Sequence, residues 1–211
     1  MGALPGTLMS SPAQHLLGGL DVAIVVAPGS SADQLEATKT SLEELGVNVL
    51  VVGPGRGATR GVRGDGREDA IEVSQSLGVA DPDSFDGVLV IADQEGAKRL
   101  AASEPAQAFL ARMDAEGKPI GAISEGVLPL LTAGLARERS VSAPDHLCGV
   151  AESKGARPGG QALTVDDNMV SLKEEAGLEH FNSVLKELLA RRRLATITIG
   201  NDTPSAVGED G

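Results

Sequence analysis

Short apolar runs that alternate with segments of helical spacing constrain this chain most. Residues 21–29 read DVAIVVAPG and residues 47–53 read VNVLVVG, and such continuous apolar runs are typical of strands buried on both faces of a sheet. Residues 31–46 between them have helical spacing, with Ser31 placed to cap the start of the helix and Gly46 its end. A strand, a helix and a second strand in this order predict a right-handed parallel unit.

The alternation continues along the rest of the chain. Apolar runs at 87–92 and 119–123 predict two further buried strands, and residues 95–117 between them predict a helix with a break near Pro105. The later elements expected are a short helix at 126–135, a fifth strand at 139–144, two short strands at 161–172 and an amphipathic helix at 177–193. Alternating strands and helices predict an α/β fold, a doubly wound, mostly parallel sheet sandwiched by helices.

The two ends of the chain and one internal stretch fall outside this pattern. Residues 1–19 are expected to form a flexible N-terminal extension to an α/β domain at 20–193. The β-branched alternation of LATITIG, 194–200, predicts an added edge strand, so that residues 194–211 form a C-terminal strand and an acidic tail. Residues 54–69, rich in glycine and charge, predict a loop or a short hairpin.

Composition argues against several classes of protein. The chain of 211 residues is 41% hydrophobic, enough for one domain with a core, and no apolar stretch approaches the ~20 residues of a membrane span. Lys and Arg number 18 against 30 Asp and Glu, and the net charge of −12 argues against nucleic acid, since phosphate backbones need a basic surface. The single cysteine, Cys148, fits a reducing cytoplasm, and the first residues lack the basic segment of a signal peptide. We therefore expect a cytoplasmic protein without a nucleic-acid or membrane partner.

The clearest chemical motif is the junction KPIGAISEGVLPLL, residues 118–131. Ser124 falls where a buried strand runs into a helix, and its small neighbours Ala122 and Gly126 make the stretch a near match to the G-x-S-x-G nucleophile elbow. A serine nucleophile also needs a general base within hydrogen-bond reach. His146 is the credible base in the downstream sequence, because His180 belongs to the predicted terminal helix.

Other motifs give weaker signals. GPGRGA at 53–58 matches a dinucleotide-binding pattern, but more glycine follows it instead of a helix, so a flexible loop is favoured over a cofactor site, and a nucleotide-binding module is the weaker reading. The histidines His15, His146 and His180 are scattered, and Cys148 has no partner cysteine. We therefore expect neither a cofactor nor a metal site.

Six segments, taken in order, resemble those of one protein family: DVAIVVAPG, SLEELGVNVLVVGP, DPDSFDGVLVIA, FLARMDAEGKPIGAISEG, LLTAGL and LEHFNSVLKELL. Through them, residues 20–192 are similar to the ThiJ/PfpI family of the class I glutamine amidotransferase-like superfamily. The resemblance implies a flavodoxin-like, class I glutamine amidotransferase-like fold. The wording GKPIGAISEGVLPLLTAGL resembles most the C-terminal domain of large-subunit catalases, which is similar in fold and lacks the cysteine machinery.

The chain departs from that family at the positions that carry its chemistry. Active members have a cysteine at the elbow, often a histidine beside it, and a glutamate after the first strand. In this sequence Ser124 takes the cysteine position, Glu125 the histidine position and Gln34 the glutamate position. The family's Pro-Gly-Gly after the third strand is replaced by Ala-Asp-Gln, with Asp93 in the middle. The resemblance thus places Gln34, Asp93, Glu125 and Gly126 around an elbow crevice that lacks a thiolate.

Two hypotheses follow from these departures. The first is a catalytically degenerate ThiJ/PfpI-like protein with a binding, assembly or stress-protection role, because Ser124 replaces the cysteine and its usual partners are missing. The alternative is a serine-dependent hydrolase or amidase, or a glyoxalase-like enzyme, that uses Ser124 with His146. The resemblance also implies a small-molecule ligand in the elbow crevice and a homodimer or larger homo-oligomer, to which residues 194–200 would add a strand.

Overall fold

Seven strands form the central sheet of the computed structural model, which describes residues 16–201, with side chains described through Thr198. In order across the sheet they are β11 (Leu163–Asp166), β12 (Met169–Leu172), β8 (Ile120–Ile123), β7 (Gly87–Ile91), β1 (Asp21–Val26), β3 (Asn48–Gly53) and β6 (Gln75–Ser76). Only the edge pair β11 and β12 is antiparallel, so the predicted mostly parallel sheet is confirmed. Of the N-terminal extension predicted at 1–19, residues 1–15 lie outside the described residues, as does the acidic tail at 202–211, whereas Leu17 is buried in the core and the Gly19 amide donates to the Gly46 carbonyl at 2.8 Å.

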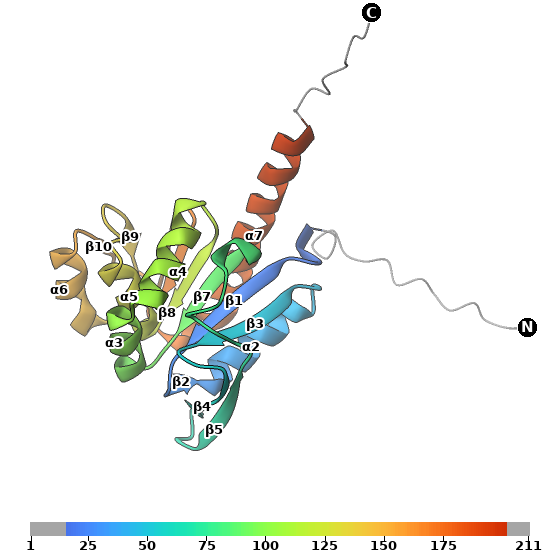
Figure 1. Ribbon diagram of the computed structural model, residues 1–211. Helices are drawn as coiled ribbons and strands as arrows, with labels where there is room; N and C mark the ends of the chain where they lie inside the picture. Colours follow the sequence, from blue (N-terminus) through green and yellow to red (C-terminus); the bar gives the residue numbers. More distant parts are fainter. Residues whose placement is uncertain (1–15, 202–211) are drawn as a thin grey trace, which may run out of the picture.

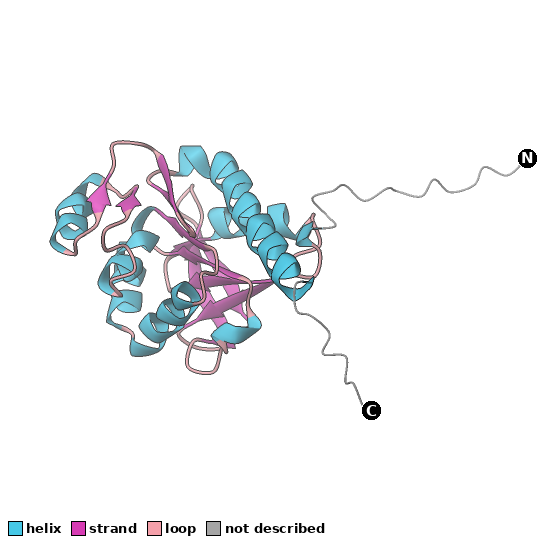
Figure 2. Ribbon diagram, turned by 90° about the horizontal axis from the view of Figure 1, so that it is seen from above, coloured by secondary structure: helices cyan, strands magenta, loops and turns pink. Residues whose placement is uncertain are grey.

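Helices cover both faces of this sheet (Figure 1; Figure 2). The helices are α2 (Ala32–Glu43) and α7 (Leu178–Asn201) on one face, and α3 (Gln94–Ala102), α4 (Glu104–Ala115) and α5 (Val127–Thr132) on the other. Side chains alternate along β1: Val22, Ile24 and Val26 join the core beneath α2 and α7. Ala23 and Val25 join the core beneath the other three helices. The predicted α/β sandwich is therefore confirmed.

The helix boundaries follow the capping residues of the sequence. The hydroxyl of Ser31 accepts a hydrogen bond from the Gln34 amide at 3.2 Å, which caps α2 as predicted. The break expected near Pro105 falls at Ser103, which ends α3 and caps α4. Pro105 lies in the first turn of α4, where no intrahelical hydrogen bond is lost.

The glycine-rich stretch 54–69 takes part in a hairpin that is longer than the sequence predicted. β4 (Gly57–Val62) pairs with β5 (Glu68–Val73), and β4 also pairs with β2 (Ser30–Ser31). The hairpin is thereby attached to the turn that follows β1. This attachment brings its tip close to the carboxyl edge of the central sheet, where β1 ends.

The fifth strand predicted at 139–144 is only partly formed. Two of its residues make β9 (Ser140–Val141), which pairs with β10 (Arg157–Pro158) outside the central sheet. Between these two strands lies α6 (Asp145–Ser153). The two short strands predicted at 161–172 both join the central sheet, β12 beside β8 and β11 at the edge.

The edge strand predicted for residues 194–200 is wrong, because α7 continues through them to Asn201. No glycine or proline occurs between Arg193 and Ile199, and Gly200 comes only one residue before the helix ends, whereas β propensity depends strongly on a neighbouring strand to pair with. The β-branched residues fit the helix in the usual way: the Thr196 hydroxyl donates to the Arg192 carbonyl at 3.1 Å, and the Thr198 hydroxyl donates to the Leu194 carbonyl at 2.9 Å. The helix therefore extends past the sheet (Figure 1).

Candidate functional site

The turn between β8 and α5 forms a tight elbow. A single 3₁₀ turn, Ser124–Gly126, joins the strand to the helix. Ser124 has a φ of 51°, in the left-handed region that residues with a side chain rarely adopt. At Gly126, an added β-carbon would overlap the carbonyl oxygen of Val90, so glycine lets the turn pack directly on β7. Strained backbone of this kind is concentrated at functional sites, which makes the elbow the natural centre of a site.

A crevice of about 450 Å³ lies beside the elbow, at the carboxyl edge of the sheet. The structure brings four of the sequence-derived site residues together in its lining, Gln34 and Asp93 among them, with Glu125 next to Ser124. His146, from the first turn of α6, lines the crevice too. Gly126 does not line it and is buried behind the elbow. Crevices at this edge are where doubly wound sheets bind ligands.

Glu125 and His146 contact each other directly. Nε2 of His146 lies 2.9 Å from Oε1 of Glu125, whose side chain is 14% exposed, whereas that of His146 is 51% exposed. The other carboxylate oxygen of Glu125, Oε2, is buried and has no hydrogen-bond partner among the described residues. Within residues 16–201, no side-chain hydrogen bond of Ser124 joins it to His146. The imidazole is thus bound to the residue beside the serine and not to the serine hydroxyl.

Asp93 is engaged in holding the backbone. Its Oδ1 accepts a hydrogen bond from the Gly96 amide at 2.6 Å and caps the start of α3. Gly29, with a φ of 99°, packs so closely on this carboxylate that a β-carbon there would overlap it. Asp93 therefore fixes the start of α3 at the crevice wall. It also holds the end of β7 against the turn that follows β1.

Arg63, at the end of β4, is the lining residue that the sequence reasoning missed. Its guanidinium contacts Asp33 Oδ1 at 2.6 Å, Glu36 Oε2 at 3.0 Å and Asp69 Oδ2 at 2.7 Å. The Gly64 amide also donates to Asp33 Oδ2 at 2.7 Å. The two acids flanking the predicted position 34 thus pair with the hairpin, about thirty residues later in the chain. The opposite charges of the two segments could have suggested this pairing, but many other acidic and basic residues of the chain have opposite charges too.

These contacts change the titration of both groups. The hydrogen bond from Gly64, followed by that from Arg63, holds the pKa of Asp33 below its ordinary value of 3.8. Hydrogen bonds to Glu36, Asp33 and Asp69 raise the pKa of Arg63 well above its ordinary range. The hairpin tip is therefore joined to α2 by groups that stay charged near neutral pH.

The remaining motifs do not form a site of their own. The glycine motif at 53–58 leads from β3 into β4, and no helix begins there. Cys148 lies on α6, and its Sγ is 3.7 Å from the carbonyl oxygen of Pro144. Among residues 16–201, no three His, Cys, Asp or Glu side chains are grouped to hold a metal ion. None of the described helices combines the length and apolarity needed to cross a membrane.

Comparisons with known proteins agree with this architecture. A ThiJ/PfpI domain protein from Brachyspira murdochii has a TM-score of 0.73 at 16% identity, covering 82% of this chain and 98% of its own. DJ-1beta of Drosophila melanogaster has a TM-score of 0.73 at 19% identity, covering 86% and 97%. A ThiJ/PfpI family protein from Pseudomonas syringae has a TM-score of 0.72 at 20% identity, covering 99% and 86%. No curated protein matches the sequence significantly. The family model for DJ-1/PfpI proteins matches residues 21–188, so this chain belongs to the DJ-1/PfpI family.

Proposed function

We propose that this chain is a catalytically degenerate, cytoplasmic member of its family, whose elbow crevice binds a small molecule in a binding, assembly or stress-protection role. The contact between His146 and Glu125, at 2.9 Å, carries this proposal. A serine at an elbow reacts only when a base takes its proton, and among the described residues no hydrogen bond joins Ser124 to His146, the histidine of the crevice lining, whose Nε2 is directed to Glu125. Ser124 therefore shapes the crevice without acting as a nucleophile.

The charge of Glu125 supports the same proposal. A hydrolase must stabilise the oxyanion that forms when its nucleophile attacks a carbonyl group. Glu125 is adjacent to Ser124 in the chain and lines the same crevice, so an ionised carboxylate there opposes that negative charge. Together with the missing thiol, this makes acyl transfer at the elbow unfavourable.

The polar groups of the crevice favour a ligand that donates hydrogen bonds. Oε2 of Glu125 is a buried acceptor without a partner among the described residues, and a buried acceptor left unsatisfied costs about 1–3 kcal/mol. Arg63, which also lines the crevice, is already paired with three carboxylates. The crevice is thus suited to a small amine or amide that donates to Glu125 once its side chain, which is 14% exposed, turns Oε2 toward the crevice.

Fluorophosphonate labelling distinguishes this proposal from the serine-dependent hydrolase or amidase version of the alternative, and not from its glyoxalase-like version. We expect no labelling of Ser124 from about pH 6 to 9, with the Ser124→Ala variant as the background. The alternative rests on the elbow geometry of Ser124, and it would give labelling that depends on both Ser124 and His146. Such labelling would refute the proposal that the chain is catalytically degenerate.

Ligand-observed saturation-transfer NMR tests the binding role, with glycinamide and ethanolamine as probes and acetate as the anionic counterpart. We expect signals from the two amines and none from acetate, and loss of the amine signals in Glu125→Gln. Glu152→Gln, an exposed acid on α6, is the matched control and should retain them. Equal signals in both variants would refute the role of Glu125.

The homo-oligomer implied by the family resemblance remains part of the proposal and can be measured by sedimentation velocity. Strand addition through residues 194–200 is no longer a route to it, because these residues are helical. A monomer at all concentrations tested would remove assembly from the proposed role.

A further inference from the structure

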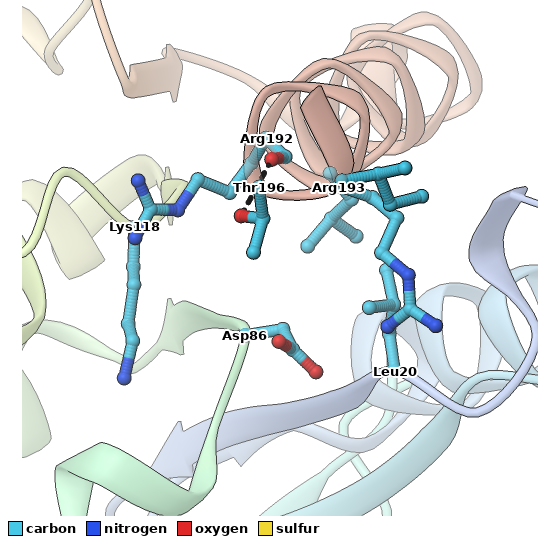
Figure 3. Close-up of a pocket in the computed structure, with 8 residues that line it drawn as sticks. Leu20, Asp86, Lys118, Arg192, Arg193 and Thr196 are labelled. Atoms are coloured by element: carbon cyan, nitrogen blue, oxygen red, sulfur yellow. Dashed lines mark hydrogen bonds between the residues drawn. The ribbon is translucent and has the colours of Figure 1, made fainter. Parts of the chain in front are cut away.

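A second hollow, of about 420 Å³, lies at the opposite edge of the sheet (Figure 3). Its floor comes from the amino ends of three parallel strands: Leu20 immediately precedes β1, Asp86 precedes β7 and Lys118 lies just before β8. Its other wall is the part of α7 that extends past the sheet. From this arrangement we propose that the hollow binds a small amphipathic monoanion, a carboxylate with a hydrocarbon chain.

The wall formed by α7 is a single helical face. Leu189, Arg192, Arg193, Thr196 and Ile197 line the hollow, and their spacing of three, one, three and one residues places them on one side of a helix. The same side of α7 is packed in the core at Leu189, which is 1% exposed. After Leu189 the same side of α7 carries arginines, and it still faces the amino ends of the strands.

Two arginines supply the positive charge of the hollow. Arg192 and Arg193 are half-buried, and within residues 16–201 neither side chain has an ion pair or hydrogen bond. They project from α7 on either side of the hollow, with Asp86 between and below them (Figure 3). Guanidinium groups bind carboxylate and phosphate oxygens with paired hydrogen bonds, so an anionic head held between them would satisfy donors that have no partner among the described residues.

The other charged groups of the hollow limit how much negative charge it can accept. Nζ of Lys118 is held by the Glu116 carboxylate at 2.7 Å and by the Pro82 carbonyl at 2.9 Å. The carboxylate of Asp86 accepts a hydrogen bond from the Asp21 amide at 2.9 Å and keeps one negative charge on the floor. With Lys118 neutralised by Glu116, two arginines face one aspartate. The balance of one positive charge suits a monoanion better than a polyanion.

Apolar side chains also line the hollow. Leu20 lies on its floor and Leu189 on the α7 wall, and Ile197 of the same wall is 47% exposed, one of the few large apolar side chains so exposed among the described residues. A hydrocarbon chain lying against these side chains would cover Ile197, and burial of apolar area contributes about 25 cal/mol per Å². A lining that combines two arginines with apolar side chains therefore matches an amphipathic ligand.

Isothermal titration calorimetry of the full chain tests the site with decanoate below its micelle-forming concentration. Acetate lacks the hydrocarbon chain and decan-1-ol lacks the charge, and we expect each to bind at least about tenfold more weakly. Arg192→Gln combined with Arg193→Gln should weaken decanoate by at least about tenfold, and Ile197→Ser should also weaken it. Arg191→Gln is the matched control: Arg191 is an exposed neighbour that does not line the hollow, and its loss should change affinity by less than about twofold.

Several outcomes would overturn the proposal. Equal affinity for decanoate and decan-1-ol would show that the charge is not recognised, and an equal effect of Arg191→Gln would show general charge attraction in place of a site. Binding to phosphatidylglycerol vesicles without binding to free decanoate would mean a membrane surface and refute a small-molecule site. Thermal unfolding of each variant checks its fold, and if the double variant does not fold, Ile197→Ser and the single arginine variants still decide.

Discussion

Gly126 packs directly against the carbonyl oxygen of Val90, so the elbow of β8 and the strand β7 beside it are in backbone contact. This contact sets how near the start of α5 comes to the sheet. Because a β-carbon would overlap a backbone atom, which has no rotamer through which to move away, the neighbouring strand itself would have to shift.

Gly126→Ala should therefore destabilise the fold by about 1–3 kcal/mol or more, the usual cost of overpacking a dense interior. Chemical denaturation of the purified variant measures this cost. The matched control is Gly149→Ala on the exposed side of α6, where an added β-carbon meets nothing within 4 Å. That change should stabilise by about 0.5–1 kcal/mol, since glycine is a poor helix former. Equal effects of the two substitutions would contradict the close contact.

Ser124→Gly tests whether the elbow backbone is strained. A residue with a side chain pays roughly 1–2 kcal/mol for a left-handed φ, whereas glycine loses roughly 0.4–1 kcal/mol through its freer unfolded chain. We therefore expect Ser124→Gly to raise the free energy of unfolding by up to about 1 kcal/mol, and Ser124→Val to lower it, because β-branched residues disfavour positive φ. Asp167→Gly, at a surface turn with a φ of 56°, is the control and should behave like Ser124→Gly. A loss of stability in Ser124→Gly alone would mean that the serine side chain stabilises the elbow.

Much of the fold could be predicted from the sequence because buried parallel strands leave a direct signal. The apolar runs that became β1, β3, β7 and β8 are continuous, since helices cover both faces of the sheet. The strand predicted at 194–200 is wrong because β-branched alternation alone does not make a strand, and residues 194–199, which contain neither glycine nor proline, continue the preceding helix.

The sequence predicts the candidate site only in part, for a different reason. The residues that follow buried strands, such as Asp93 and Ser124, can be placed at the carboxyl edge from topology alone. The side-chain partners cannot, because Glu125 meets His146, and Arg63 meets Asp33, only after separate segments have packed together. The spacing of residues in the sequence does not show which side chains of distant segments will meet.

The buried hydrogen bond between Thr38 and Asn182 should couple α2 to α7. The Thr38 hydroxyl donates to Oδ1 of Asn182 at 3.0 Å, and both residues are buried. Thr38→Val should cost about 1–3 kcal/mol because it leaves the amide oxygen unsatisfied, whereas Thr38→Val with Asn182→Leu should recover part of the loss. Thr40→Val, on the exposed side of α2, controls for helix propensity and should be within about 0.5 kcal/mol of wild type. Strictly additive effects in this double-mutant cycle would show that the two side chains do not interact.

The contact between Asp33 and the hairpin tip should be released by acid. The pKa of Asp33 is lowered in the folded protein, mainly by the hydrogen bond from the Gly64 amide and next by that from Arg63. The ionised carboxylate therefore stabilises the folded hairpin fully at pH values above 3.8, the ordinary pKa of an aspartate. That stabilisation should be lost as the pH falls below 3.8 and through the lowered pKa, while Arg63 stays protonated throughout. The amide resonance of Gly64 in a pH titration by NMR reports the change, because this amide donates to Asp33 Oδ2. Asp33→Asn should abolish the transition, and Asp65→Asn, which removes a neighbouring acid of the same turn bound to Arg67, should leave it in place. A midpoint above 3.8, or a transition that persists without Asp33, would mean that another group opens the hairpin.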